Sequence, residues 1–284
     1  MAGVWFTAAA TGRIGCGAAM QEARHTLNLI FDHRLLRHIN ESAVKERGSA
    51  SKAMLLAEKW LGKKITSVPL SLFEHTLSFL LTLPIPIYSS LVYALITNAR
   101  GLPHYPGMYL RALYYRRKLG RMEPNVFIDQ NVFFAYPRSV ELKEFSYIDK
   151  GVMIMSRTSK VGRRVHIAPR VFVSGGGDFE IEDYACIATN SSIITSTEVL
   201  KAGARCSGPM VSADQRNVLR GKVLIKKDAF IGANVTILPD VTVAQGSVVA
   251  AGITLSKSTE PWGVYLGAKV QKLAQRDPVR WPDN

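Results

Sequence analysis

The sequence predicts a mainly β protein organised around a parallel β-helix, and three observations lead to this fold class. An aliphatic residue returns every six positions between 225 and 255, a small or β-branched residue sits four places after each of the first five, and the same spacing recurs in triplets upstream. A period of six fits neither the 3.6-residue turn of a helix nor a hairpin, which needs turn residues between its strands. Six-residue repeats are typical of solenoids in which three short strands close each coil.

The aliphatic series is continuous in its C-terminal part and falls into groups of three before it. Intervals of seven or eight residues separate the groups, which indicates extra residues at one corner of the coil. We expect every member of the series to point into the core and to carry no chemistry. The predicted inward residues are Met122, Ile128, Phe134, Leu142, Ile148, Ile154, Val161, Ile167, Val173, Ile181, Ile187, Ile193, Ile225, Ile231, Ile237, Val243, Val249 and Leu255.

One interval interrupts the series, because Ile193 and Ile225 lie 32 residues apart. We therefore place the β-helix at residues 122–260 and expect a loop, residues 195–222, to leave it. A loop of this length in a compact repeat is usually functional or disordered.

The first 121 residues differ from the repeats in composition, and we assign them to a helical, basic N-terminal region. They hold sixteen Lys or Arg against six Asp or Glu, whereas residues 122–284 hold twenty against sixteen. Residues 1–20 lack the basic leader of a signal peptide, and we expect them to be poorly ordered. A basic region of this kind favours an anionic surface, which we take to be a membrane rather than nucleic acid.

Residues 76–98 carry no formal charge and are just long enough to span a bilayer. Pro84 and Pro86 would break a helix in the middle, so we expect two half-length apolar helices. The segment 100–121 then mixes Tyr with Arg and Lys, which suits a peripheral membrane contact through residues 76–121. The alternative is a helical cap over the open first coil, whose edge would otherwise invite aggregation. Both interpretations can hold together.

Several function classes lack the residues that they need. Cys16, Cys186 and Cys206 form no metal-spaced pair, and we expect no metal. No P-loop or dinucleotide fingerprint occurs. A three-histidine zinc site is excluded from the repeats, whose one histidine is His166.

Particular segments resemble a known family. Gly208-Pro209 inside the loop, the run from Ile231 to Thr242 and the ending Pro261–Val270 resemble the left-handed β-helix acyltransferases, closest to the sugar O-acetyltransferases of cell-surface polysaccharide synthesis. The resemblance implies a left-handed coil, a homotrimer, acetyl-CoA in the groove between neighbouring prisms and a loop that reaches the next subunit. Residues 261–284 would form a C-terminal tail with a short helix at 269–276.

The resemblance also implies an activity: transfer of an acetyl group from acetyl-CoA to a sugar hydroxyl in polysaccharide or glycolipid synthesis, in the cytoplasm at the inner face of the cytoplasmic membrane. Two alternatives stay open. A nucleotide-sugar N-acetyltransferase tolerates a weak or missing base, because its amine acceptor loses a proton after the attack. A non-catalytic hexapeptide scaffold would bind a partner or glycan.

The catalytic base is the least settled part of the interpretation. A sugar hydroxyl of high pKa must lose its proton as it attacks the thioester, so a base must lie within hydrogen-bonding reach. In most of the family that base is a histidine in the loop, but this loop contains none. The candidates are therefore His166, which precedes an inward residue and should point outward, and the loop carboxylates Glu198 and Asp214. A chain without a base is the remaining alternative.

Cofactor positions follow from the resemblance as well. Small residues of the late coils would let the pantetheine chain lie against the backbone, and lysines would meet the phosphates as point charges. Tight corners and solvated lysines are the alternative interpretation. The candidates are Gly232, Ala250, Ala251, Gly252, Lys257 and Lys269.

Overall fold

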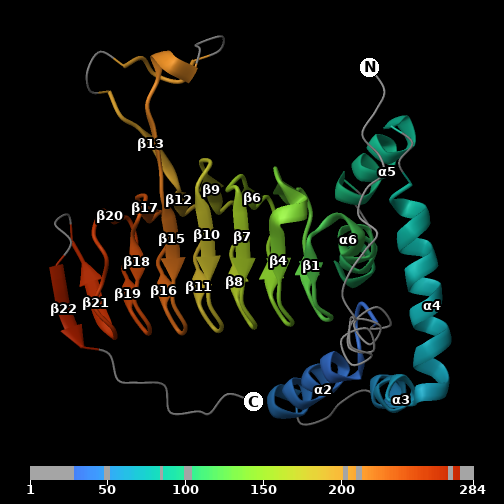
Figure 1. Cartoon of the computed structure of the whole chain (residues 1–284). Coiled ribbons are helices and arrows are strands. Elements are labelled where there is room, and N and C mark those ends of the chain that lie inside the picture. The colour runs from blue at the N-terminus through green and yellow to red at the C-terminus, as the bar shows by residue number, and fades with distance from the viewer. Residues whose placement is uncertain are drawn as a thin grey trace, which may run out of the picture.

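The computed structural model describes residues 29–47, 52–83, 86–98, 104–200, 204–208, 213–267 and 271–275. Residues 1–20, expected to be poorly ordered, and Lys269 lie outside these ranges. Helices gather at one end of a long solenoid of strands, and a loop projects from its side (Figure 1).

The solenoid is a left-handed parallel β-helix with three faces, as predicted. Along the solenoid as far as β20, successive strands belong to the first, second and third sheet in turn. The first sheet contains β1 (Arg121–Met122), β4 (Val140–Leu142), β7 (Thr158–Val161), β10 (Asp178–Ile181), β15 (Lys222–Ile225) and β18 (Thr242–Val243). The second contains β2 (Phe127–Ile128), β5 (Tyr147–Ile148), β8 (His166–Ile167), β11 (Cys186–Ile187), β16 (Phe230–Ile231), β19 (Val248–Val249), β21 (Gly263–Leu266) and β22 (Gln271–Gln275). The third contains β3 (Phe133–Phe134), β6 (Met153–Ile154), β9 (Phe172–Ser174), β12 (Ser192–Ile194), β17 (Thr236–Ile237) and β20 (Thr254–Leu255).

The register of the strands aligns the predicted inward residues in ladders. Ile148 pairs with Ile167, and Ile187 pairs with Ile231 in the same sheet. All members of the series from Ile128 to Leu255 are buried in one core cluster. Met122 is the exception: it is half-buried, because it lies at the open end of the prism beside the helices. The prediction of the core is confirmed for the rest of the series.

The corners of the prism explain the small residue four places after each aliphatic one. The chain turns at residues with φ near +60°, for example Asn234 at 56° and Asp240 at 62°. Asn and Asp reach this left-handed region at a lower cost than most residues. The residues that follow, Val235 and Val241, point inward and are buried.

The predicted loop leaves the solenoid between β12 and β15, at the corner where the third sheet passes to the first. Its base is an antiparallel hairpin of β13 (Ser196–Glu198) and β14 (Val218–Arg220), with the short 3-10 helix η2 (Ala213–Gln215) further out. The loop projects away from the prism (Figure 1).

Helices cover the first coil. The described ones are α2 (His33–Arg47), α3 (Lys52–Leu61), α4 (Lys64–Leu81), α5 (Pro86–Asn98) and α6 (His104–Lys118). The apolar stretch divides between α4 and α5 near Pro84 and Pro86, as expected. Helix α6 lies against β1 and β2, where Leu113 and Tyr115 are buried. A helical cap is therefore present over the end of the prism.

Polar contacts fix this cap to the first corner of the β-helix. Asn125 donates its side-chain amide to Asp32 at 3.0 Å and accepts the backbone N–H of Asp32 at 2.9 Å. Arg34 forms an ion pair of 2.7 Å with Glu144 of the second coil. The carboxylate of Asp32 thus joins the N-terminal region to the solenoid.

The C-terminal segment corrects one prediction. Residues 271–275, expected to belong to a short helix, form β22 and pair antiparallel with β21. The physical reason is that β21 would otherwise be an unpaired edge of the second sheet, and a returning strand satisfies its backbone groups.

Candidate active site

His166 lies on the outer face of the second sheet, where the sequence placed it. Its ring stacks on the ring of Tyr147, one coil below, with centroids 5.2 Å apart and planes 14° from parallel. Its Nε2 lies 3.3 Å from Oδ2 of Asp149, and the imidazole side chain is 43% exposed. With an ionised Asp149 as the acceptor of this hydrogen bond, Nε2 carries the proton and Nδ1 is the acceptor nitrogen.

A series of hydrogen bonds connects Tyr147 to Asp129 in the preceding coil and to Arg111 of α6. The hydroxyl of Tyr147 donates to Oδ2 of Asp129 at 3.3 Å, and Arg111 of α6 donates to Oδ1 of the same carboxylate at 3.2 Å. Arg111 also donates to the carbonyl of Ile128 at 2.7 Å. Burial raises the pKa of Tyr147, and the carboxylates of Asp149 and Asp129 raise it further, so the phenol stays protonated. The helical cap therefore helps to fix the platform on which His166 stacks.

The next residue along this face is Cys186, which pairs with His166 in the register of β8 and β11. Burial raises the pKa of its thiol, so Cys186 is a poor thiolate nucleophile. Among the described residues, no group of His, Cys, Asp and Glu could hold a metal ion. His166 and Asp149 are therefore the candidate acid–base pair of this face.

Sequence reasoning missed Asp149, Tyr147, Asp129 and Arg111. A usable signal was present for Tyr147: like His166, it directly precedes an inward isoleucine, so the two must stack in neighbouring coils. Asp149 has the complementary position just after Ile148. The contact of Arg111 depends on how α6 docks on the first coil, which the repeat does not encode.

The two loop candidates lie elsewhere. Glu198 belongs to β13 and Asp214 to η2, and both side chains are exposed. The loop leaves the prism at the corner between the third and first sheets, which is opposite the second sheet and His166. Within one chain, the structure does not bring the histidine and the loop carboxylates together.

The late coils place most of the cofactor candidates side by side. Gly232 lies so close to the next coil that a Cβ there would approach the backbone N of Ala251 to 2.5 Å, so coil stacking requires the glycine. Ala251 and Gly252 are exposed, and a Cβ on Gly252 would meet nothing within 4 Å. Lys257 is also exposed. This corner offers an open backbone surface, whereas Lys269 lies outside the described residues.

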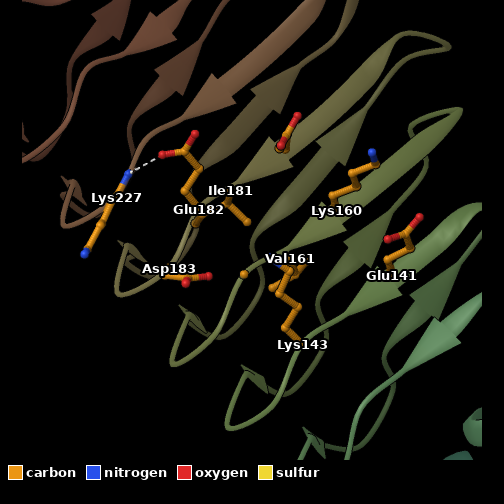
Figure 2. Close-up of a pocket in the computed structure, with 10 residues that line it drawn as sticks. Glu141, Lys143, Lys160, Val161, Ile181, Glu182, Asp183 and Lys227 are labelled. Carbon is orange, nitrogen blue, oxygen red and sulfur yellow. Dashed lines mark hydrogen bonds between the residues drawn. The ribbon is translucent and has the colours of Figure 1, made fainter. Parts of the chain in front are cut away.

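A groove on the first sheet has a volume of about 320 Å³ but holds none of the predicted site residues. Figure 2 shows its charged side chains, which include Lys143, Lys160, Glu182 and Lys227. Lys160 lies in register between Glu141 and Glu180. Such alternating pairs stabilise neighbouring strands by about 0.2–1 kcal/mol each, so strand register accounts for the charge pattern.

Comparisons with known proteins support one class. The chain is 31% identical over 112 residues to dTDP-4-amino-4,6-dideoxy-D-glucose acyltransferase of Escherichia coli, covering 39% of this chain and 58% of that protein. It is 39% identical over 57 residues to a probable macrolide acetyltransferase of Lysinibacillus sphaericus, covering 20% and 32%. The chain thus spans less than two thirds of the length of these relatives. No family model matches it.

Solved structures agree with the fold. A mutant of AntD, an N-acyltransferase from Bacillus cereus in complex with dTDP and coenzyme A, superposes with a TM-score of 0.53 and 26% identity, covering 57% of this chain and 87% of that one. Another AntD mutant, in complex with dTDP-4-amino-4,6-dideoxyglucose and coenzyme A, gives the same TM-score and identity. In fold and sequence, the β-helix of this chain is similar to acyltransferases built from hexapeptide repeats.

Proposed function

We propose that the protein transfers an acyl group, with acetyl as the first choice, from coenzyme A to the amino group of a nucleotide-linked sugar. The observation that carries this proposal is the match to AntD, which spans 57% of this chain and whose structures hold coenzyme A and a dTDP-amino sugar. The Escherichia coli relative is named for the same amino sugar.

The donor would lie along the late coils. The exposed backbone at Ala251 and Gly252 leaves room for a pantetheine chain, and Lys257 supplies a positive charge for its phosphates. Gly232 would act indirectly, because it permits the close stacking that shapes this corner.

His166 and Asp149 would handle the proton. The acceptor nitrogen attacks the thioester carbonyl carbon, the carbon–sulfur bond breaks, and coenzyme A leaves as the thiol. Nδ1 of His166 accepts the proton that the nitrogen sheds and passes it to the departing sulfur, while Asp149 holds the ring through its contact with Nε2. Asp149 is a positioning residue in this scheme.

A hydroxyl acceptor is the second candidate, as in the sugar O-acetyltransferases, and one observation favours it. A histidine paired with a carboxylate at 3.3 Å provides the base that a hydroxyl requires and that an amine can do without. The place of either reaction in cell-surface polysaccharide or glycolipid synthesis remains part of this proposal.

We also propose that the working enzyme is an oligomer, with a homotrimer as the first choice. The loop and His166 lie on opposite sides of the prism. Glu198 and Asp214 would therefore reach a histidine of a neighbouring copy rather than the one in their own chain.

The test is an acyl-transfer assay with the purified protein and acetyl-CoA. Turnover is measured as the release of the free thiol of coenzyme A. dTDP-4-amino-4,6-dideoxyglucose serves as the amine acceptor. The same sugar nucleotide with a hydroxyl at the 4-position serves as the matched hydroxyl acceptor. Turnover with the amine alone supports the first proposal, and turnover with the hydroxyl supports the second. Absence of coenzyme A binding in calorimetry contradicts both and favours the scaffold alternative.

A further inference from the structure

Helix α4 exposes five large apolar side chains on the outer side of the part whose side chains the structure describes, residues 68–81. Val68, Leu72, Phe73, Phe79 and Leu80 are between 46% and 61% exposed. Spacings of four residues (Val68 to Leu72) and of seven (Leu72 to Phe79, Phe73 to Leu80) place them on one side of the helix, with no charged residue among them. Exposed apolar surface of this extent marks an interaction site more often than a free surface.

The inner side of α4 combines buried polar side chains with Leu77 and Leu81, which are partly buried against the core. Its described buried side chains are Ser71, Glu74 and Ser78. Ser78 donates to the carbonyl of Leu113 at 2.7 Å, and Glu74 accepts the N–H of Ile30 at 2.8 Å. These hydrogen bonds fix which side of α4 faces the protein, so the apolar side cannot turn inward without breaking them.

A cationic pocket of about 510 Å³ adjoins the apolar stripe. Arg117 and Lys118 come from the last turn of α6, and Arg138 comes from the 3-10 helix η1 (Pro137–Ser139) of the first coil. No carboxylate is among the described residues that line it. The dipole of α6 favours cations at its own C-terminus, but it does not account for an arginine contributed by a separate element.

Phe79 joins the stripe and the pocket. It is part of the apolar stripe, it lines the pocket, and the guanidinium of Arg117 lies over its ring at 5.1 Å. Arg138 donates to the backbone carbonyl of Arg117 at 3.0 Å, which anchors its guanidinium at the C-terminal end of α6. An apolar surface and a cationic pocket that share one side chain fit a ligand with an apolar body and an anionic head.

We propose that this surface docks the protein on an anionic lipid bilayer. The α4 stripe enters the boundary between headgroups and acyl chains, and the pocket binds a headgroup phosphate. None of the described helices is long and apolar enough to cross the bilayer. The proposed contact is peripheral, and the location at the inner face of the cytoplasmic membrane, expected from the sequence, stays a prediction.

Co-sedimentation of the full chain with vesicles tests the proposal. One set of vesicles is phosphatidylcholine, and the other is equal parts of phosphatidylcholine and phosphatidylglycerol. We expect binding to the mixed vesicles. Leu72→Ser with Phe73→Ser should weaken it at least about tenfold, since two inserted side chains lose their burial. Each cation near an anionic surface contributes about 1 kcal/mol, which is roughly fivefold in binding. Removing two of them in Arg117→Gln with Arg138→Gln should therefore weaken binding about 30-fold.

The matched control removes two exposed lysines from the β-helix, Lys143→Gln with Lys160→Gln, and should leave binding nearly unchanged. All substituted side chains are exposed, so the variants should fold, which circular dichroism can check. The proposal is overturned if the intact chain binds neither kind of vesicle, or if the lysine control loses as much binding as the Arg117/Arg138 variant. It is also overturned if the Leu72/Phe73 variant keeps its binding but loses oligomers in light scattering, because the stripe would then contact a second copy.

Discussion

The β-helix and helix α4 of the N-terminal region place their large apolar residues in opposite ways. In the β-helix, aliphatic residues such as Ile167 and Ile187 are fully buried, and each coil covers the next. In the helical region, α4 buries Ser78 and leaves Leu72 and Phe79 exposed. The solenoid therefore completes its own core, whereas α4 needs a further surface to cover it. Under our two proposals, the β-helix carries the chemistry and the helical region carries the membrane attachment.

The largest expected effect separates these two roles. His166→Ala should lower turnover by about 10²–10⁴-fold with a hydroxyl acceptor and by less with an amine, because only the hydroxyl must lose its proton during the attack. Vesicle binding by this variant should stay at the level of the intact protein. Equal turnover of variant and intact protein would remove His166 as the base, and Glu198→Gln and Asp214→Asn would then be the variants to assay.

Stability should follow the contrast in burial. Ile187→Ala removes a fully buried side chain from the middle of the solenoid and should lower the free energy of unfolding by about 2–5 kcal/mol. Leu72→Ala, on the exposed side of α4, should change it by no more than about 0.5 kcal/mol. Urea unfolding in the absence of lipid measures both. A similar loss for the two variants would mean that the α4 stripe is covered within the protein itself.

The smallest effect concerns the contact between the helical region and the β-helix, where Asp32 is hydrogen-bonded to Asn125. Burial alone would raise the pKa of Asp32, but hydrogen bonds from Arg34 and Asn125 outweigh it and lower the pKa below its ordinary value of 3.8. A lowered pKa means that the ionised carboxylate stabilises the folded state above this value, and that the contribution is lost as the pH falls through the folded pKa. Asp32→Asn should cost about 1 kcal/mol at neutral pH.

Thermal unfolding measured from neutral pH down to below the ordinary pKa of aspartate checks this prediction. The intact protein and Asp32→Asn should differ at neutral pH and converge in acid. Curves that stay parallel over the whole range would show that the carboxylate charge does not stabilise this contact.

The sequence predicted features that repeat and missed features that do not. The six-residue period located the core, the outward position of His166 and the exit of the loop, because each follows from counting along the chain. The partner of His166 was missed because Asp149 belongs to another coil, and the extra residues at one corner alter the count between them. The contacts of Arg111 depend on the docking of α6, and β22 depends on the free edge of β21. Neither leaves a periodic signal.

The corner at which the loop leaves has a genetic consequence. If each loop serves the histidine of a neighbour, a chain that lacks His166 still offers a sound loop, and a chain with a damaged loop still offers a sound histidine. Two such inactive chains, expressed together, would assemble into mixed oligomers. Some active sites would then combine the intact His166 of one chain with the intact loop of the other. Activity would reappear through complementation between two defective copies of the same gene, and dilution that separates the subunits would abolish it again.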